Sequence, residues 1–564
     1  MKGLGLLVLC VAGLVSHGAA GAATCYVNGP DARAADTNPG TEEAPWKTIG
    51  RAGRAPELKA GDVVLIQSGV YRESVDITVS GEPGKPITLS AAPGARAVVK
   101  GSEMVNGGEG KRLSEDTGVT EPFPNAFKRV WKVKLGEEFF NDPRYPGAYA
   151  DRARRHLSQV FVSDRQPLQL IGPSPMFAEI GLEVLEPIGK GLSDMLDNSF
   201  FFDPSDQTPY VKMGGEPGWS WIEIGVRAFA LTVSKVHDVV IRGLECRHNR
   251  QVAGMWPMCS VGECERVVVE DCKFEFADFC GLSLGNSRHC VVRRCDMSWN
   301  GDTGLGVSAT CDCVIEDCTL MCNNYRHFSP GWHAGGMKNI PDNVRTTIRR
   351  CEVAYNFNCC GIWFDGASPG HVNSDIRILD NVCHHNDGTA IFHEANGGGG
   401  SIAGNLCFGN RGIGIDVQAH IPDPTAQTQK RLWVVNNTVA DNVEGIRVVD
   451  RGGWQILRDT TVMNNLLLRN SEPGDSGQGA AAELLFWMHA DEGDRRADTS
   501  NHSDYNVFCA GIPLVLKPAT ASGTPVPWSS GSSALARTCT PGPYRFPSRA
   551  RTVDSGFWPV RGWT

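Results

Sequence analysis

The chain has 564 residues, of which 41% are hydrophobic, and a net charge of −9 at pH 7. This acidic balance, without a cluster of Lys and Arg interleaved with aromatic residues, excludes an ordinary basic nucleic-acid-binding protein. The 65 glycines favour many short strands over long helices. The length is therefore compatible with one elongated body built from repeats.

The N-terminal segment has the features of a secretory signal. Lys2 precedes an apolar run over residues 4–15, and small residues follow up to Ala22. The apolar run is too short to span a bilayer. We therefore expect residues 1–22 to be a signal peptide, and an exported protein that does not insert into a membrane.

Residues 23–105 are predicted to form an N-terminal cap and the first strands, separated by Gly and Pro. Residues 38–49 read NPGTEEAPWKTI, and residues 61–73 read GDVVLIQSGVYRE. Both phrases resemble the N-terminal module of secreted bacterial right-handed parallel β-helix proteins. The resemblance implies this all-β solenoid fold and a periplasmic or extracellular location in a bacterium. Lyases, epimerases and glycosidases share this fold.

The repeat is lost over residues 106–235, where an inserted antiparallel β subdomain is predicted. Segments such as residues 130–133 and 200–203 read as short apolar strands there. The insertion either forms a wall beside a groove or serves as a structural cap.

Repeating coils are readable over residues 236–490. Cys272, Cys295 and Cys318 each end a short apolar strand and lie 23 residues apart, while longer steps elsewhere carry loops. Strands a whole coil apart run in the same direction, so the sheets should be parallel. A column of turn asparagines is expected to stack side chain on side chain; it comprises Asn300, Asn323, Asn356, Asn386, Asn410, Asn442 and Asn470. Residues 491–564 are expected to cap the open end.

Cysteine usage is high for an exported chain, at 20 residues. Most recur at fixed coil positions, which predicts small side chains stacked inside a narrow core. One such column continues to Cys351, a second holds Cys290 and Cys313, and a third holds Cys383 and Cys407. A few disulfides among the others, such as Cys509 with Cys539, are the alternative. Because no paired C-x-x-C spacing is present, we expect no metal centre.

Four similar strands define the candidate site. If Ile362, Ile391 and Ile415 point inward, alternation puts two columns on the outer face. The first column contains Lys338, Trp363, Phe392 and Asp416. The second contains Asp365, Glu394 and Gln418. Loops at residues 325–334 and 366–375 flank these columns, as substrate-shaping loops do.

Asp365 and Glu394 form the candidate catalytic pair. Adjacent coils place their carboxyl groups about 5 Å apart, the separation found in retaining glycosidases. Two carboxylates so close cannot both remain ionised easily. Glu394 would then be the acid/base and Asp365 the nucleophile.

Several neighbours are expected to bind substrate. Trp363 offers a flat face for a sugar ring, and Lys338 and Arg447 could bind hydroxyl groups or an acidic substituent. His333, His393 and Asp416 complete the predicted binding set.

The phrases GIWFD at residues 361–365 and AIFHE at residues 390–394 resemble β-helical glycoside hydrolases, in particular the bacterial β-xylosidase group and its α-fucosidase-like relatives. The resemblance implies a secreted glycosidase in which Asp365 and Glu394 carry the chemistry. The sequence thus favours a monomeric retaining glycoside hydrolase, without a cofactor, acting on a plant or algal polysaccharide.

Two alternatives remain open. Asp365, Glu394 and Asp416 could together bind Ca²⁺, with Lys338 as the base of a polysaccharide lyase or C5-epimerase acting on a uronate polymer. The carboxylates could instead be a solvated face of a non-catalytic glycan-binding surface protein.

Overall fold

The structure is a computed structural model. It describes residues 22–105, shorter stretches between 119 and 213, residues 514–517, and residues 222–509 apart from 251–255, 330–332, 366–372, 395–397, 420–430, 451–458, 471–482 and 488–501. Residues 1–21 of the expected signal, and Cys539 of the possible disulfide, lie outside this range. Among the described residues, no helix is long and apolar enough to cross a bilayer.

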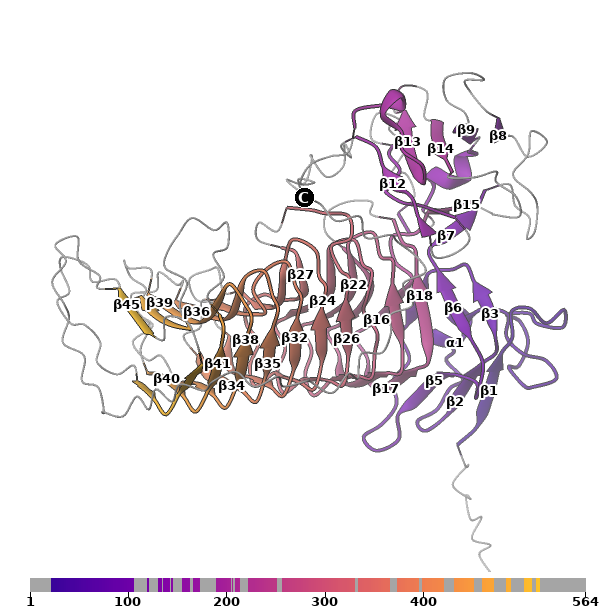
Figure 1. The fold of residues 1–564 in the computed structure, drawn as a ribbon. Coiled ribbons are helices and arrows are strands. Elements are labelled where there is room, and N and C mark those ends of the chain that lie inside the picture. Colours follow the sequence, from indigo (N-terminus) through magenta and orange to yellow (C-terminus); the bar gives the residue numbers. More distant parts are fainter. Residues whose placement is uncertain are drawn as a thin grey trace, which may run out of the picture.

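Three long parallel sheets run along the molecule, and the later coils of the chain contribute a strand to each of them in turn (Figure 1). Sheet 1 has thirteen strands: β1 (Thr24–Val27), β2 (Val63–Ile66), β5 (Ile87–Ala91), β17 (His237–Arg242), β20 (Glu265–Glu270), β23 (Val291–Arg293), β25 (Val314–Glu316), β28 (Thr347–Arg349), β31 (Ser374–Leu379), β34 (Gly398–Ala403), β37 (Leu432–Val435), β40 (Thr460–Met463) and β43 (His502–Asp504).

Sheet 2, which carries the candidate site, has twelve strands: β4 (Val75–Ile77), β16 (Leu231–Ser234), β19 (Pro257–Gly262), β22 (Cys280–Gly285), β24 (Thr303–Ser308), β27 (Gly335–Asn339), β30 (Cys360–Phe364), β33 (Ile391–Glu394), β36 (Ile413–Ala419), β39 (Glu444–Asp450), β42 (Leu484–Trp487) and β45 (Leu514–Lys517).

Sheet 3 has seven strands: β26 (Thr319–Met321), β29 (Glu352–Ala354), β32 (Val382–His384), β35 (Leu406–Phe408), β38 (Thr438–Ala440), β41 (Leu466–Leu468) and β44 (Val507–Cys509). In the first coils, the strands at the corresponding position form a separate sheet: β3 (Gly69–Tyr71), β6 (Ala97–Lys100), β18 (Leu244–Arg247) and β21 (Lys273–Glu275).

The only α-helix among the described residues, α1 (Ile49–Gly53), lies against β4 in the first coils. The β-helix includes one more coil, β43–β45, beyond the predicted boundary at residue 490. The sequence did not reveal this coil because the step from Asn465 to its ladder partner Asn506 is long.

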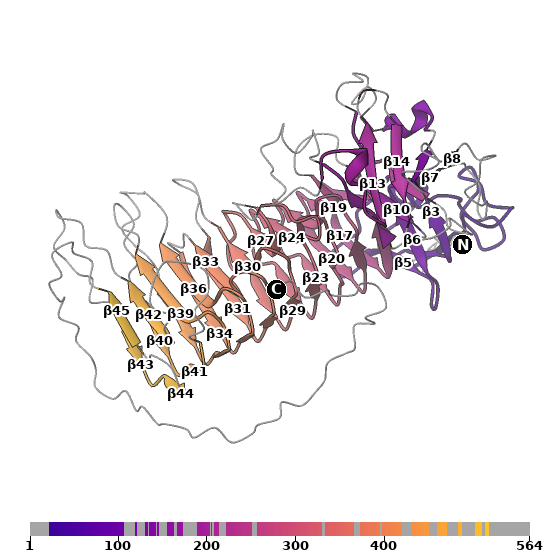
Figure 2. The same ribbon diagram turned by 45° about the horizontal axis from the view of Figure 1, so that its top comes forward.

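The inserted subdomain stands on the N-terminal coils (Figures 1 and 2). It comprises β7 (Ser102–Met104), β8 (Val119–Thr120), β9 (Val130–Val133), β10 (Val160–Val162), β11 (Gln166–Pro167), β12 (Gln169–Leu170), β13 (Ser199–Asp203), β14 (Thr208–Lys212), β15 (Ile222–Gly225) and the 3₁₀ turns Glu137–Phe140 and Leu192–Asp194. Its pairings are antiparallel except between β12 and β13. The Ser158 hydroxyl donates to Asp278 at 2.6 Å, which ties the subdomain to the coils.

The core is a set of inward-facing columns, one residue per coil. Ile362, Ile391 and Ile415 are register partners and fully buried, as the alternation predicted. The cysteine columns are likewise confirmed: Cys272, Cys295, Cys318 and Cys351 are all buried in this core. The cysteine side chains are small and pack against larger core residues such as Phe274 and Phe364.

The expected asparagine column is present and forms a hydrogen-bonded ladder. The Asn356 side-chain amide donates to Asn386 at 2.7 Å, Asn386 donates to Asn410 at 2.9 Å, and Asn442 donates to Asn470 at 2.9 Å. Glu483 ends the ladder by accepting from the Asn470 amide at 2.6 Å. A second ladder continues the column that begins with the cysteines, and comprises Asn381, Asn405, Asn437, Asn465 and Asn506.

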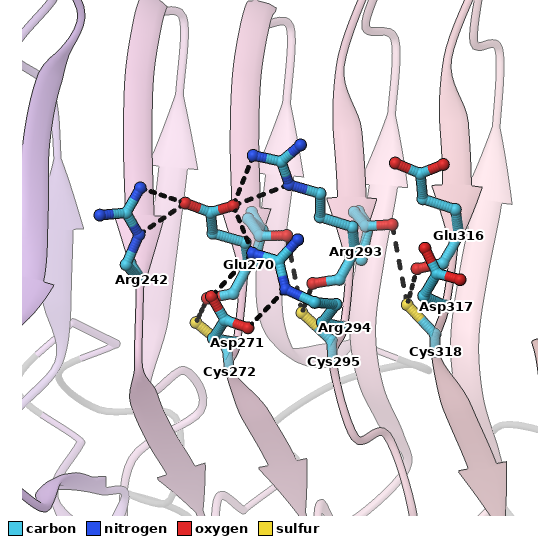
Figure 3. A network of polar contacts seen from close by, with 12 residues as sticks. Arg242, Glu270, Asp271, Cys272, Arg293, Arg294, Cys295, Glu316, Asp317 and Cys318 are labelled. Carbon is cyan, nitrogen blue, oxygen red and sulfur yellow. Dashed lines mark hydrogen bonds and ion pairs between the residues drawn. The ribbon is translucent and has the colours of Figure 1, made fainter.

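Charges alternate in sign from coil to coil along the outer face of sheet 1 (Figure 3). Glu270 pairs with Arg242 on the preceding coil and with Arg293 on the following one, while Glu316 pairs with Arg349. The arginines of these pairs are exposed to solvent, and an ion pair at the surface contributes little by itself, typically ~0–1 kcal/mol. A row of such ion pairs along the sheet, however, favours the stacking of each coil on its native neighbours.

Removing one rung of the asparagine ladder should destabilise the whole fold. In Asn386→Ala the Asn356 amide loses its acceptor, and the contacts from Asn386 to Val353 and Asn410 are lost as well. We expect the free energy of unfolding to fall by about 3 kcal/mol, because buried polar groups are left without partners. Urea denaturation would measure this change. The matched control is Asn436→Gly, at an exposed left-handed corner (φ 57°), where an equally large loss would contradict the ladder's role.

Candidate active site

The candidate site lies on the outer face of sheet 2, where the predicted register is confirmed. Lys338 is the register partner of Trp363, Trp363 of Phe392, and Phe392 of Asp416. Arg447 follows Asp416 on the next strand. Glu394 is the last residue of β33, and Asp365 directly follows β30, so each comes one residue after the paired His393 and Phe364.

Lys338, Trp363 and Asp365 form a compact group. The Lys338 ammonium donates to Asp365 Oδ2 at 2.8 Å and lies 3.0 Å from the centroid of the Trp363 ring. Burial lowers the pKa of Lys338 below its ordinary value, and the Asp365 carboxylate opposes this shift. The ion pair thus places a fixed carboxylate beside an aromatic face.

The backbone around Asp365 is also fixed. Its amide donates to the Asn339 carbonyl at 2.8 Å, and its own carbonyl accepts from the Asn373 side chain at 2.9 Å. Neither Asn339 nor Asn373 was predicted from the sequence. The only signal was that Asn373 continues a short ladder from Asn343, whose amide donates to it at 2.9 Å.

Glu394 is held by a different partner. The Trp363 indole Nε1 donates to Glu394 Oε2 at 3.0 Å, and the same indole ring stacks on Phe392 with centroids 5.3 Å apart. Asp365 is 9% exposed and Glu394 8% exposed. Two carboxyl groups from adjacent coils therefore have different hydrogen-bond partners, a cation for Asp365 and an indole for Glu394.

Asp416 belongs to a neighbouring polar group rather than to this pair. The Arg447 guanidinium donates to Asp416 through two nitrogens, at 3.1 and 2.6 Å, and the Gln418 amide donates to it at 2.6 Å. Arg447 and Asp416 are thus bound to each other, and their predicted contact with substrate stays a prediction.

The prediction that His393 contacts substrate is corrected by its position. His393 pairs in register with Phe364 and Val417, which lie in the core, and it is fully buried. Alternation therefore points it inward, away from the face that carries Glu394. Burial lowers the pKa of His393 to about 3, so it is neutral at physiological pH.

His333 lies in a separate cluster before β27. Its Nδ1 is 2.6 Å from Asp302 Oδ1, and its ring lies among Phe279 and Phe328. These contacts place His333 beside Asp302 and the two phenylalanine rings, and its part in substrate binding stays a prediction.

The three carboxylates proposed as Ca²⁺ ligands are engaged by other groups: Asp365 by Lys338, Glu394 by Trp363 and Asp416 by Arg447. Within the part of the chain that the structure describes, no three His, Cys, Asp or Glu side chains are grouped as metal ligands.

Small residues continue the outer face of sheet 2 from Lys338 toward the insertion. In register these are Gly306, Ser283, Ser260 and Thr232. A Cβ added at Gly306 would meet only Cys280 Sγ at 3.6 Å and Ser283 Cβ at 3.8 Å, which are ordinary contacts. Neither its backbone conformation nor its packing requires glycine at this position.

Two glycines of β24 should respond differently to substitution. In Gly304→Ala the new Cβ would lie 2.7 Å from two carbonyl oxygens, whereas in Gly306→Ala it meets no close contact. We expect Gly304→Ala to lower stability by about 2 kcal/mol and Gly306→Ala to change it by less than about 0.5 kcal/mol. Denaturant midpoints would measure both. Similar losses in the two variants would show that Gly306 is needed for packing.

His393 should contribute to the acid sensitivity of the fold. Between pH 6.5 and about 3 the unfolded chain binds a proton at this residue and the folded chain does not. Stability should therefore fall as the pH drops through this window, by at most about 1.4 kcal/mol per pH unit. In His393→Leu this contribution disappears, so urea midpoints measured between pH 4 and 6 should depend less on pH. The exposed His289, changed to Asn at its left-handed position, should leave the slope unaltered.

Comparison with known proteins supports the fold. Residues 260–422 match the family model described as the right handed beta helix region. A solved structure described as XylC in complex with xylose covers 87% of this chain and 86% of its own, with a TM-score of 0.59 and 14% identity. A structure described as a glycoside hydrolase covers 85% of this chain and 97% of its own, with a TM-score of 0.48 and 11% identity.

The chain therefore has the right-handed parallel β-helix fold predicted from its sequence, with an inserted, mainly antiparallel β subdomain. Among curated proteins, the uncharacterized protein YwoF of Bacillus subtilis (strain 168) is 37% identical over 71 residues, or 13% of this chain. This match spans only 15% of that relative's length.

Proposed function

We propose that the protein is a secreted retaining glycoside hydrolase acting on a plant or algal polysaccharide or oligosaccharide, with Asp365 as nucleophile and Glu394 as acid/base. The observation that carries this proposal is the pairing of two carboxyl groups on adjacent coils with different partners. Lys338 balances the charge of Asp365, while Glu394 accepts a hydrogen bond from the Trp363 indole N–H. Retaining glycosidases use such a pair at about 5 Å.

In this mechanism Asp365 attacks the anomeric carbon while Glu394 transfers its proton to the leaving glycosidic oxygen. A covalent glycosyl ester forms on Asp365, and the aglycone departs as an alcohol. Glu394, now ionised, then takes a proton from water, and the resulting hydroxide displaces the sugar from Asp365. Lys338 donates to Oδ2, which leaves Oδ1 as the attacking atom.

The surroundings support a glycan as substrate. Trp363 and Phe392 give stacked aromatic rings beside the carboxyl groups, a surface suited to a sugar face. The outer face of sheet 2 continues from Lys338 with the small residues Gly306, Ser283 and Ser260, and further sugar units would bind there. The similar XylC structure contains a bound xylose, which is consistent with this use of the fold.

A lyase or C5-epimerase is the second candidate. Its support is the buried Lys338, whose lowered pKa is what a base that abstracts the C5 proton would need. The 2.8 Å ion pair with Asp365 favours the protonated lysine and so argues for the hydrolase.

Substitution of the two acids tests the hydrolase. In Asp365→Ala and Glu394→Ala we expect the release of reducing sugar from a panel of plant and algal glycans to fall by about 10³-fold or more. Azide should restore turnover in Asp365→Ala, giving a glycosyl azide of inverted configuration, because a small anion fills the vacated space. The exposed Asp380, changed to Asn, is the control and should remain fully active.

Two other outcomes would support the alternative functions, a lyase or a non-catalytic binding protein. An ultraviolet-absorbing unsaturated product that is lost with EDTA and in Lys338→Met would identify a lyase. Glycan binding without turnover by the unmodified protein would leave a non-catalytic binding protein.

A further inference from the structure

Gln418 is a buried polar residue beside the candidate acid/base. It is 1% exposed and is the register partner of Glu394 on the next coil. Its Nε2 donates to Asp416 Oδ2 at 2.6 Å, but its Oε1 is buried and accepts no hydrogen bond from any described residue. A buried acceptor without a donor typically costs about 1–3 kcal/mol, so its presence requires an explanation.

The orientation of this amide is fixed by chemistry. The Asp416 carboxylate is bound to Arg447 and needs donors, so the NH₂ group of Gln418 must face it. The carbonyl oxygen therefore faces away from Asp416. Because Oε1 is shielded from solvent, the missing donor must be a neighbouring protein group or a trapped water.

Glu394 can supply that donor when it is protonated. One of its oxygens, Oε2, accepts from the Trp363 indole, so the proton belongs on Oε1. Adjacent strands of a sheet lie about 4.8 Å apart, a distance that two side chains of this length can bridge. A carboxylate could not use Gln418 Oε1, since both groups only accept.

The charges around Glu394 act alongside this contact. Lys338 and Asp365 form an ion pair on the preceding coils, and Asp416 and Arg447 form another on the following ones, with Glu444 beside Arg447. Burial raises the pKa of the nearby Cys360 thiol to about 12, so it is neutral. Because the charged neighbours are largely paired, a neutral hydrogen-bond acceptor can decide the protonation state of Glu394.

We propose that Gln418 is a positioning residue that holds the proton on Glu394 by accepting a hydrogen bond from the protonated carboxyl group. Its catalytic meaning rests on the proposed hydrolase function: the proton kept on Glu394 Oε1 is the one given to the leaving oxygen. The contact itself is a property of the free protein and can be measured without substrate.

The Trp363 indole N–H can report the ionisation of Glu394, because it donates a hydrogen bond to that carboxyl group. The full chain is labelled with ¹⁵N at its 14 tryptophans in a deuterated background, and the indole signal of Trp363 is assigned by its loss in Trp363→Phe. The signal is then followed against pH in the unmodified protein and in Gln418→Met, Gln418→Glu and Glu394→Gln. Melting temperatures confirm that each variant is folded.

We expect the Trp363 signal to move with one ionisation that is absent in Glu394→Gln. In Gln418→Met, which keeps the side-chain length but removes the acceptor, the midpoint should fall by about one pH unit. In Gln418→Glu, which keeps an acceptor and adds negative charge, the midpoint should rise. A transition that persists in Glu394→Gln belongs to the ion pair of Lys338 and Asp365, since Lys338 lies over the same ring.

An unchanged midpoint in Gln418→Met would overturn the proposal, as would shifts of the same sign in both Gln418 variants, which would indicate a general disturbance of the fold. Failure of the hydrolase proposal looks different: the midpoints would shift as expected while no glycan is cleaved. Conversely, cleavage without a shift would refute only the role of Gln418.

Discussion

Hydrogen bonds between equivalent side chains of successive coils set the register on which this molecule depends. A parallel coil could slip along its neighbour by two residues and still keep its apolar side inward. The asparagine ladders prevent this, because each amide must meet the amide of the next coil, as Asn356 meets Asn386. After such a slip, each buried amide of the ladder would lose its hydrogen-bond partner, and each loss would destabilise the fold.

The candidate site inherits its geometry from this register. Lys338, Trp363 and Phe392 come from three coils whose steps differ in length, yet they lie side by side because the corners between them are held by the ladders. Loops of different lengths can therefore leave the helix without moving the outer columns. Asp365 is further secured by Asn339 and Asn373, so the carboxylate is positioned before any ligand arrives.

The sequence was sufficient to predict the solenoid, the cysteine and asparagine columns, and the relative register of Trp363 and Phe392, because each follows from a repeat or from strand alternation. It was not sufficient to predict side-chain partners. The bond from Trp363 to Glu394 depends on indole orientation, and the Arg447–Asp416 pair joins two residues that pattern alone treats as separate ligands. His393 was misassigned because a polar residue next to an acid suggests a site, whereas alternation places it among Phe364 and Val417 in the core.

The alternating charges on sheet 1 bear on how such a chain can change in length. Glu270 lies between Arg242 and Arg293, and Arg293 in turn precedes Glu316 (Figure 3). Loss of the single coil that carries Arg293 would bring two glutamates together, and duplication of it would bring two arginines together. Gain or loss of two adjacent coils would preserve the order of signs. In this part of the protein, the charges therefore favour the gain or loss of an even number of coils over an odd number.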